Sequence, residues 1–181
     1  MDLARYSARA FDRGASRLKE AFWIAVRCVF FENPWPWPSR LRVAWLRIFG
    51  ARVGRGVVVR AHVNISFPWR LTVGDHVWLG ESVAILSLAP VSIESNVCVS
   101  QRAFLCTGSH DYRAETFDLK TAPITLRAGC WVAAQAFIGP GVEVGGGSVV
   151  GAGSVVMENV PPRVLVRGNP AAVVKKILNE E

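Results

Sequence analysis

Aliphatic residues recur at every sixth position along most of the chain. From residue 126 the sequence divides into the blocks LRAGCW, VAAQAF, IGPGVE, VGGGSV, VGAGSV and VMENVP. Each block opens on an aliphatic residue, and a small or β-branched residue follows four positions later. This period matches neither a helix nor a simple alternating strand, and it is typical of a β-helix in which each block forms one short strand and one turn.

The same spacing upstream predicts an all-β solenoid of about five coils. Three blocks close one triangular coil, and stacked coils place the opening aliphatic residues in an inward ladder. We expect glycines in the turns to adopt conformations that a Cβ atom would hinder, namely Gly139, Gly145, Gly151 and Gly153. Counted in triplets of blocks, the coils are expected at 53–70, 73–90, 93–110, 126–143 and 144–161.

The repeat is interrupted once, in a loop expected at residues 109–125. This loop contains His110, within the sequence GSHD. A polar residue at a break in a regular scaffold favours a functional role, because binding and catalytic groups are concentrated on loops. His62 and His76 instead lie within repeat blocks beside turn residues, where we expect them to be solvated.

Residues 1–50 are expected to form a helical region before the solenoid, which covers residues 51–162. A first helix is predicted at 15–31, and the prolines of NPWPWPS force an extended link after it. Ser39 is predicted to N-cap a second helix that ends at Gly50. The apolar stripe predicted for this helix consists of Leu41, Ala44, Trp45, Ile48 and Phe49. Arg40, Arg42 and Arg47 lie off this stripe.

After the solenoid, residues 163–181 form a C-terminal tail. Prolines end the repeat, and the segment AAVVKKIL is expected to close the chain as a short helix or a strand.

The positive charge is concentrated in the N-terminal region. The net charge is +7, and residues 1–60 contain 12 Lys and Arg against 4 Asp and Glu, whereas residues 61–181 contain 9 against 10. Such asymmetry favours an anionic partner, and without a nucleic-acid motif a membrane surface is the preferred one. Two interpretations of the helical region stay open: a cap on the first coil, or a basic, aromatic-rich patch on anionic lipid.

The sequence favours a cytoplasmic protein, with peripheral contact to the inner membrane as an option. The apolar run AFWIAVRCVFF is too short and too interrupted for a spanning helix, and no cleavage pattern of a signal peptide is present. The four cysteines form no CxxC pair, which favours reduced cysteines packed in the core.

The repeat, the GSHD interruption and the ending PPRVLVRGNPAAVVKK together resemble the left-handed β-helix acyltransferases. The chain is most similar to the colanic acid biosynthesis acetyltransferase family and its relatives, the maltose and galactoside O-acetyltransferases. The shared motifs are TGSHD, TAPI, WVAAQAFIGPGVEVG and VVGAGSVV. The resemblance implies a homotrimer in which acetyl-CoA lies in the groove between neighbouring solenoids and the interrupting loop reaches towards a neighbour.

Acyl transfer to a hydroxyl requires a base, and His110 is the candidate. An imidazole is largely neutral at physiological pH, and the matching family position is the catalytic histidine. Asp111 could orient His110 or shape the loop. Glu115, Asp118 or a backbone carbonyl could orient the ring instead.

The resemblance also assigns residues to the donor and the acceptor. Trp131 matches a residue that lines the groove, Ala133 and Ala134 would let the pantetheine arm run close to the backbone, and Gly151 and Ala152 match positions whose amides contact the cofactor. Lys175 matches a position at the nucleotide end of CoA, with further phosphate-binding candidates in Arg163, Arg167 and Lys176. Ser87 is the candidate for acceptor binding, where relatives carry Asp, Asn or Tyr.

The function expected is therefore acetyl-CoA-dependent O-acetyl transfer to a sugar hydroxyl in exopolysaccharide biosynthesis, on an acceptor that could be lipid-linked. Serine or a nucleotide-sugar amine as acceptor, and a non-catalytic scaffold, are the alternatives. A zinc γ-carbonic anhydrase needs three histidines of which two are closely spaced, and this pattern is missing. No metal is expected.

Overall fold

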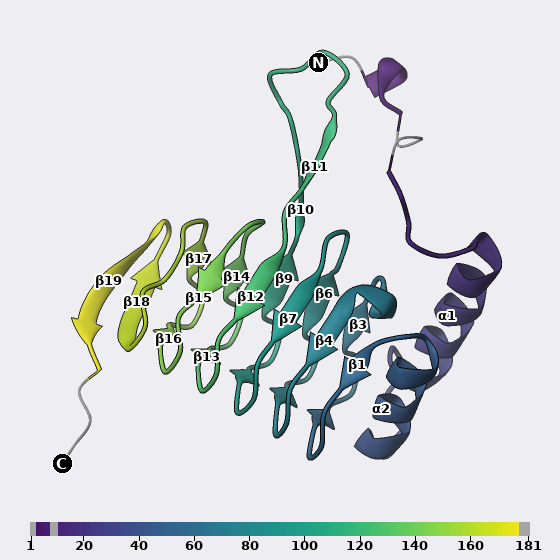
Figure 1. Ribbon diagram of the computed structural model, residues 1–181, viewed down its shortest axis with the longest axis horizontal. Helices are drawn as coiled ribbons and strands as arrows, with labels where there is room; N and C mark the ends of the chain where they lie inside the picture. The colour runs from purple at the N-terminus through teal and green to yellow at the C-terminus, as the bar shows by residue number, and fades with distance from the viewer. Residues whose placement is uncertain (1–2, 8–10, 178–181) are drawn as a thin grey trace.

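Three parallel sheets form the sides of a triangular prism in the computed structural model, which describes residues 3–7 and 11–177 (Figure 1). The first sheet contains β1 (Arg52–Val53), β4 (Leu71–Val73), β7 (Val91–Ile93), β12 (Ile124–Leu126) and β15 (Glu143–Val144). The second contains β2 (Val58–Val59), β5 (Trp78–Leu79), β8 (Cys98–Val99), β13 (Trp131–Val132), β16 (Val149–Val150), β18 (Val164–Gly168) and β19 (Ala171–Lys176). The third contains β3 (Asn64–Ile65), β6 (Ala84–Leu86), β9 (Phe104–Cys106), β14 (Phe137–Ile138) and β17 (Val155–Val156).

The five predicted coils are confirmed, and a sixth, partial turn follows them. Each coil contributes one strand to each sheet, in the order first, second, third. The sixth turn begins where Val160 bridges Val144, and it continues in β18, which pairs with β16. The antiparallel strand β19 then completes the end of the second sheet, so the strand interpretation of AAVVKKIL is confirmed.

Each sheet separates an inward ladder from an outward one. In the second sheet the inward ladder is fully or almost fully buried and consists of Val59, Leu79, Val99, Val132, Val150 and Val166. Burying each of these side chains contributes about 1.5–3 kcal/mol, and the ladder supplies a continuous core along the prism. The outer ladder of the same sheet consists of Val58, Trp78, Cys98, Trp131, Val149 and Leu165.

Turn glycines serve two different needs, of which the sequence predicted one. Gly153 has a φ of +67°, the left-handed conformation that favours glycine. Gly139, Gly145 and Gly151 do not adopt this conformation, so the reason predicted for these three glycines was wrong. A Cβ atom on Gly145 would lie 2.4 Å from the nitrogen of Pro162 in the next coil. Glycine is therefore required there because two backbones approach closely.

The interruption of the repeat is a β-hairpin that projects from the prism (Figure 1). β10 (Gly108–His110) pairs antiparallel with β11 (Leu119–Thr121), and we call residues 108–121 the arm. The arm leaves after β9 and returns to β12, so it extends from the corner between the third and first sheets.

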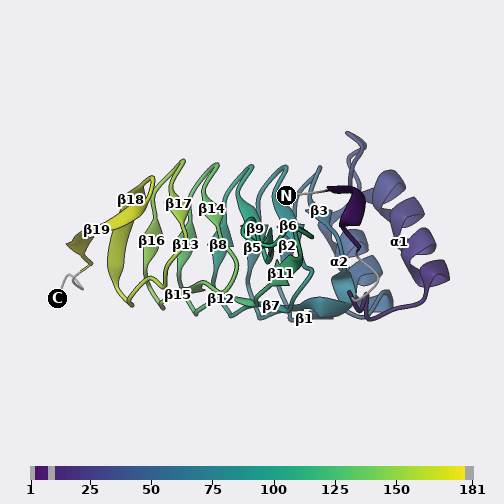
Figure 2. The same cartoon turned by 90° about the horizontal axis from the view of Figure 1, so that it is seen from above.

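Two helices cover the N-terminal end of the prism. α1 (Arg17–Phe30) is N-capped by Ser16, whose side chain accepts a hydrogen bond from the amide of Lys19. α2 (Ser39–Ile48) packs against the first coil, and Figure 2 shows α1 outside it. Trp23, Phe31 and Leu46 are buried in the same hydrophobic core as the coils. Neither helix, within the described ranges, has the length and hydropathy of a membrane span.

The apolar stripe predicted for the second helix is buried only in part. Phe49, the residue after α2, is buried and Trp45 packs against the core, whereas Ile48 is exposed. The buried residues within α2 are Arg42, Val43 and Leu46. Arg42 is buried because its guanidinium donates to the carbonyls of Phe30 and Trp37, both at 2.8 Å.

The N-cap prediction for Ser39 was also wrong. Ser39 is the first residue of α2, and its side chain accepts a hydrogen bond from the amide of Val59 at 2.7 Å. The hydroxyl therefore ties the helix to the first coil.

Candidate active site

His110 lies at the end of β10, on the arm, with its ring held from two sides. Its Nδ1 donates a hydrogen bond to the carbonyl oxygen of Phe117 at 2.8 Å. The aromatic ring of Phe117 stacks on the imidazole, with the ring centres 4.2 Å apart and the planes at 2°. Tyr6, from the N-terminal segment, also makes an edge-to-face contact with the imidazole, with the ring centres 5.5 Å apart.

This arrangement assigns the protonation of the neutral ring. A carbonyl oxygen only accepts hydrogen bonds, so Nδ1 must carry the proton. In the neutral imidazole Nε2 is then the free lone pair, which can accept a proton from another molecule. Of the orienting groups expected from the sequence, the backbone carbonyl holds the ring.

Asp111 shapes the arm. Its carboxylate pairs with Lys120 on the opposite strand at 2.8 Å and accepts a hydrogen bond from the amide of Arg113 at 3.0 Å. These contacts, that with Lys120 first, hold the pKa of Asp111 below its ordinary value. Glu115 forms an ion pair with Arg5 at 2.6 Å, which ties the N-terminal segment to the tip of the arm.

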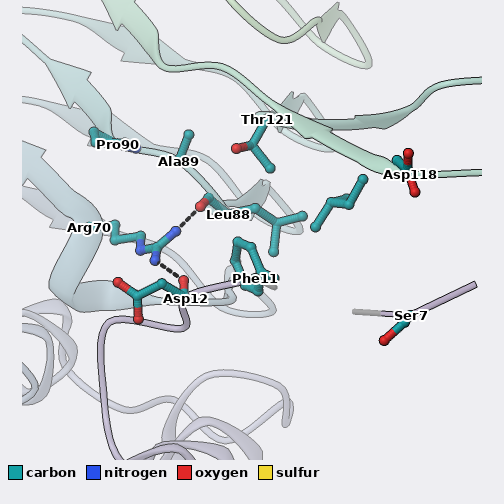
Figure 3. Close-up of a pocket in the computed structure, with 10 residues that line it drawn as sticks. Ser7, Phe11, Asp12, Arg70, Leu88, Ala89, Pro90, Asp118 and Thr121 are labelled. Carbon is teal, nitrogen blue, oxygen red and sulfur yellow. Dashed lines mark hydrogen bonds between the residues drawn. The ribbon is translucent and has the colours of Figure 1, made fainter. Parts of the chain in front are cut away.

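A cavity of about 650 Å³ lies between the base of the arm, the prism and the N-terminal segment (Figure 3). Leu119, which lines it, is the direct partner of His110 across the hairpin. Directly paired residues of an antiparallel ladder point to the same face, so His110 and the cavity share one face of the arm. The full lining is Ser7, Phe11, Asp12, Arg70, Leu88, Ala89, Pro90, Asp118, Leu119 and Thr121.

Arg70 fixes the wall of this cavity. Its guanidinium donates to the backbone carbonyls of Leu88 and Asp12, so it joins the second coil to the N-terminal segment (Figure 3). It also lies over the ring of Phe11, at 5.1 Å from the ring centre. Sequence reasoning missed Arg70 and Asp12, because the cavity combines three separate segments and no motif links them.

Ser87, the predicted acceptor contact, points into the prism. It is fully buried, and its hydroxyl accepts from the amide of Phe67 at 2.9 Å and donates to the carbonyl of the same residue at 3.0 Å. The hydroxyl therefore holds a turn and offers no group to the cavity. Its neighbours in the sequence, Leu88 and Ala89, line the cavity instead.

The residues expected at the donor lie at a different corner of the prism from the arm. Ala133 and Ala134 follow β13 at the corner between the second and third sheets. The carbonyl of Ala134 accepts a hydrogen bond from the amide of Gly153 in the next coil, so Ala152 lies at the same corner as Ala134. One chain by itself therefore does not bring these residues together with His110.

Other expected donor contacts differ in how accessible they are. Trp131 belongs to the outer ladder, is 46% exposed, and donates from Nε1 to the hydroxyl of Ser100 at 2.8 Å. The amide of Gly151 already donates to the carbonyl of Val166, so it is used within the solenoid. Lys175 is exposed on β19.

The three histidines are not brought together. The Nδ1 atom of His62 lies 3.2 Å from the carbonyl oxygen of Glu32, and His76 is exposed at a corner of the second coil. Within residues 3–7 and 11–177 no cluster of three or more His, Cys, Asp or Glu side chains could hold a metal ion.

The comparisons with known proteins agree with this fold. The chain is 38% identical to the colanic acid biosynthesis acetyltransferase WcaF of Escherichia coli (strain K12), over 184 residues and 99% of both chains. The chain belongs to the colanic acid biosynthesis acetyltransferase family. No family model matches the sequence.

Two further comparisons place this family among the hexapeptide-repeat acetyltransferases. The galactoside O-acetyltransferase of Escherichia coli (strain K12) is 27% identical over 150 residues, covering 81% of this chain and 74% of the other. A hexapeptide-repeat acetyltransferase from Vibrio cholerae, solved as a complex with acetyl-coenzyme A, superposes with a TM-score of 0.82 at 26% identity and covers 97% of each chain.

Proposed function

We propose that the protein is an acetyl-CoA-dependent O-acetyltransferase that acts on a sugar hydroxyl in exopolysaccharide biosynthesis. The observation that carries the proposal is the geometry of His110, whose Nδ1 is bound to the carbonyl of Phe117 at 2.8 Å and whose Nε2 is left to accept a proton. Both relatives are named as acetyltransferases, which supports acetyl transfer. The description of WcaF as a colanic acid biosynthesis acetyltransferase supports a polysaccharide pathway.

In this proposal His110 is the general base. A hydroxyl is a poor nucleophile near neutral pH, and removal of its proton as it attacks typically accelerates transfer by about 10²–10⁴-fold. Acetyl-CoA supplies the acetyl group as a thioester, and CoA leaves as the thiol. The acyl–sulfur bond breaks as the acyl–oxygen bond forms, and one proton passes from the acceptor oxygen to the sulfur. His110 holds that proton at Nε2 between the two events, while the carbonyl of Phe117 stabilises the charged ring.

The cavity beside the arm is proposed as the acceptor site. Its wall combines the carboxylates of Asp12 and Asp118 and the hydroxyl of Thr121 with the apolar side chains of Leu88 and Phe11. Carboxylates and hydroxyls can accept hydrogen bonds from sugar hydroxyls, and apolar side chains can pack on the face of a sugar ring.

A homotrimer would supply the donor site. Within one chain the arm and the Ala134 corner are separate, so a neighbouring solenoid must present its donor corner to the arm for the reaction to occur. The projecting arm and the exposed Trp131 of the outer ladder support such an assembly. The residues present fit acetyl-CoA: Ala134 and the exposed Ala152 leave room for a pantetheine chain, and the exposed Lys175 and Lys176 can meet phosphates, whereas Ala133 is 6% exposed and offers little surface.

An acceptor screen tests the proposed function. Acetyl-CoA is incubated with the protein and a panel of hydroxyl and amine acceptors: mono- and oligosaccharides, nucleotide-amino sugars and serine. Products are identified by mass spectrometry and thiol release is followed in parallel. We expect a mass gain of one acetyl group on a saccharide, located on oxygen. Acetylation confined to an amine or to serine, or no transfer to any acceptor, would contradict the proposal.

A further inference from the structure

The outer side of α1 is apolar and open. Leu18, Phe22 and Val29 follow one another at helical spacings of four and seven, and they are 73%, 66% and 48% exposed. Ile24, 51% exposed, lies two positions after Phe22 and so points to a different side of the helix. Large apolar side chains that are exposed together in this way mark an interaction surface.

The rest of α1 explains why this side is not needed for the fold. Trp23, on the opposite side of the helix, is 1% exposed and donates from Nε1 to the carbonyl of Ile65 at 2.8 Å. Figures 1 and 2 both show α1 as the outermost element at this end of the prism. The outer side therefore faces away from every coil.

An aromatic side chain extends this surface beyond the end of α1. Trp37 donates from Nε1 to the carbonyl of Val29 at 3.0 Å, and Trp35 stacks on Trp37 with the ring centres 6.4 Å apart. Trp35 is 66% exposed. We call Leu18, Phe22, Val29 and Trp35 the α1 face.

The charges around the α1 face are positive. Residues 1–60 contain 12 Lys and Arg against 4 Asp and Glu. Within α1 and the link after it, Glu20 is neutralised by Arg13 at 2.8 Å and Glu32 by Arg27 at 3.0 Å. Arg17, on α1, is exposed, and so is Arg40 at the start of α2, beside residues 54–58 of the first coil.

We propose that the α1 face docks on the surface of an anionic lipid bilayer. An apolar helix side that carries aromatic residues and is bordered by uncompensated cations is the pattern of a helix that lies in the interface of a membrane. A second copy of the same face is the other apolar occupant, but it would bring two positively charged ends together. The proposal is independent of the acetyl-transfer chemistry.

Vesicle flotation tests the proposal directly. The full chain is mixed with vesicles of phosphatidylcholine containing about one third phosphatidylglycerol, or of phosphatidylcholine alone, and the floating fraction is measured at low and high salt. We expect flotation with the anionic vesicles that weakens as salt is raised. Leu18→Gln and Phe22→Gln should each lower the partition coefficient by about tenfold, because each removes an apolar side chain from the lipid.

Matched variants distinguish docking through the α1 face from non-specific adsorption of exposed apolar residues to the vesicles. Met157→Gln and Val173→Gln replace equally exposed apolar residues far along the chain, and they should float like the unchanged protein. Arg17→Gln with Arg40→Gln should reduce flotation at low salt only. Circular dichroism checks that each variant folds.

Two results would overturn the proposal. One is an unchanged protein that stays at the bottom with anionic vesicles at low salt, or that floats as well after Phe22→Gln. The other is a concentration-dependent increase in mass by sedimentation velocity that Phe22→Gln abolishes, since the α1 face would then bind a second copy.

Discussion

Nδ1 of His110 and the carbonyl oxygen of Phe117 are joined by a hydrogen bond of 2.8 Å across the arm. The same residue, Phe117, stacks its ring on the imidazole. Phe117, seven residues after His110 in the sequence, therefore fixes both the tautomer and the plane of the imidazole ring.

Replacing His110 should abolish transfer without affecting the fold. His110→Asn removes the proposed base, and thiol release with a saccharide acceptor should fall by about 10²–10⁴-fold. His76→Asn is the matched control, because His76 is exposed in a left-handed conformation that asparagine tolerates. Equal rates for the two variants would exclude His110 as the base.

Replacing Phe117 should affect positioning alone. Phe117→Ala keeps the backbone carbonyl and removes the stacked ring, whose contact is worth about 0.5–1.5 kcal/mol. We expect kcat to fall by about two- to tenfold, with the KM for acetyl-CoA unchanged. Tyr112→Ala, on the exposed part of the same arm, should leave both constants unchanged. An altered KM with an unaltered kcat would contradict this role.

Asp111 should prove dispensable for the proton transfer. Asp111→Asn keeps an oxygen for the amide of Arg113 and loses the charge that pairs with Lys120. Activity should stay within about threefold, whereas loss of a carboxylate that orients a catalytic histidine costs about 10⁴-fold. A drop of that size would show that Asp111 takes part in the chemistry.

The pH dependence of the arm follows from the same carboxylate. Because the pKa of Asp111 is lowered in the folded chain, its contribution to stability is present above the ordinary aspartate value of about 3.9. It is lost as the pH falls through the lowered value. Protection of the arm against proteolysis should therefore be constant from about pH 5 to pH 8, and the protection given by the Lys120 contact should disappear only below the ordinary value.

Arg42 should be required for stability. Arg42→Met would leave the buried carbonyls of Phe30 and Trp37 without their charged donor, at about 1.5–3 kcal/mol for each hydrogen bond. We expect the free energy of unfolding in urea to fall by about 3 kcal/mol or more. Arg40→Met, on the exposed side of the same helix, should change it by less than about 0.5 kcal/mol.

Cysteine reactivity should report burial. All four cysteines are free, and burial raises the pKa of the Cys130 thiol to about 12. Near pH 8 Cys130 should resist alkylation until the protein is unfolded, whereas the exposed Cys28 should react at once. Mass spectrometry of alkylated peptides distinguishes them, and early labelling of Cys130 would contradict the packing described for the fourth coil.

The sequence predicted the coils because one rule, an aliphatic residue every sixth position, decides which side chains point inward. The side of α2 that faces the coils could not be predicted in the same way. A pattern that counts only apolar residues excludes Arg42, yet its guanidinium is buried because the backbone presents the carbonyls of Phe30 and Trp37 to it.

The candidate site shows the same limit. The position of His110 on an arm outside the coils could be predicted from the sequence, because the six-residue pattern breaks there. Ser87 was assigned by its position in a family pattern, but at that position the chain turns its hydroxyl to the backbone of Phe67. Arg70 and Asp12 lie far apart in the sequence, and only the fold brings them to one wall.

The number of stacked coils sets the distance between the capped end of the prism and the arm. The arm leaves from the third coil, and neighbouring parallel strands are about 4.8 Å apart, so its root lies two strand spacings, about 10 Å, beyond the first coil against which α2 packs. With the α1 face resting on lipid, the imidazole would work at a fixed height above the headgroups. Deleting one whole coil would lower that height by one strand spacing. The number of coils in the sequence would therefore set the distance from the imidazole to the headgroups.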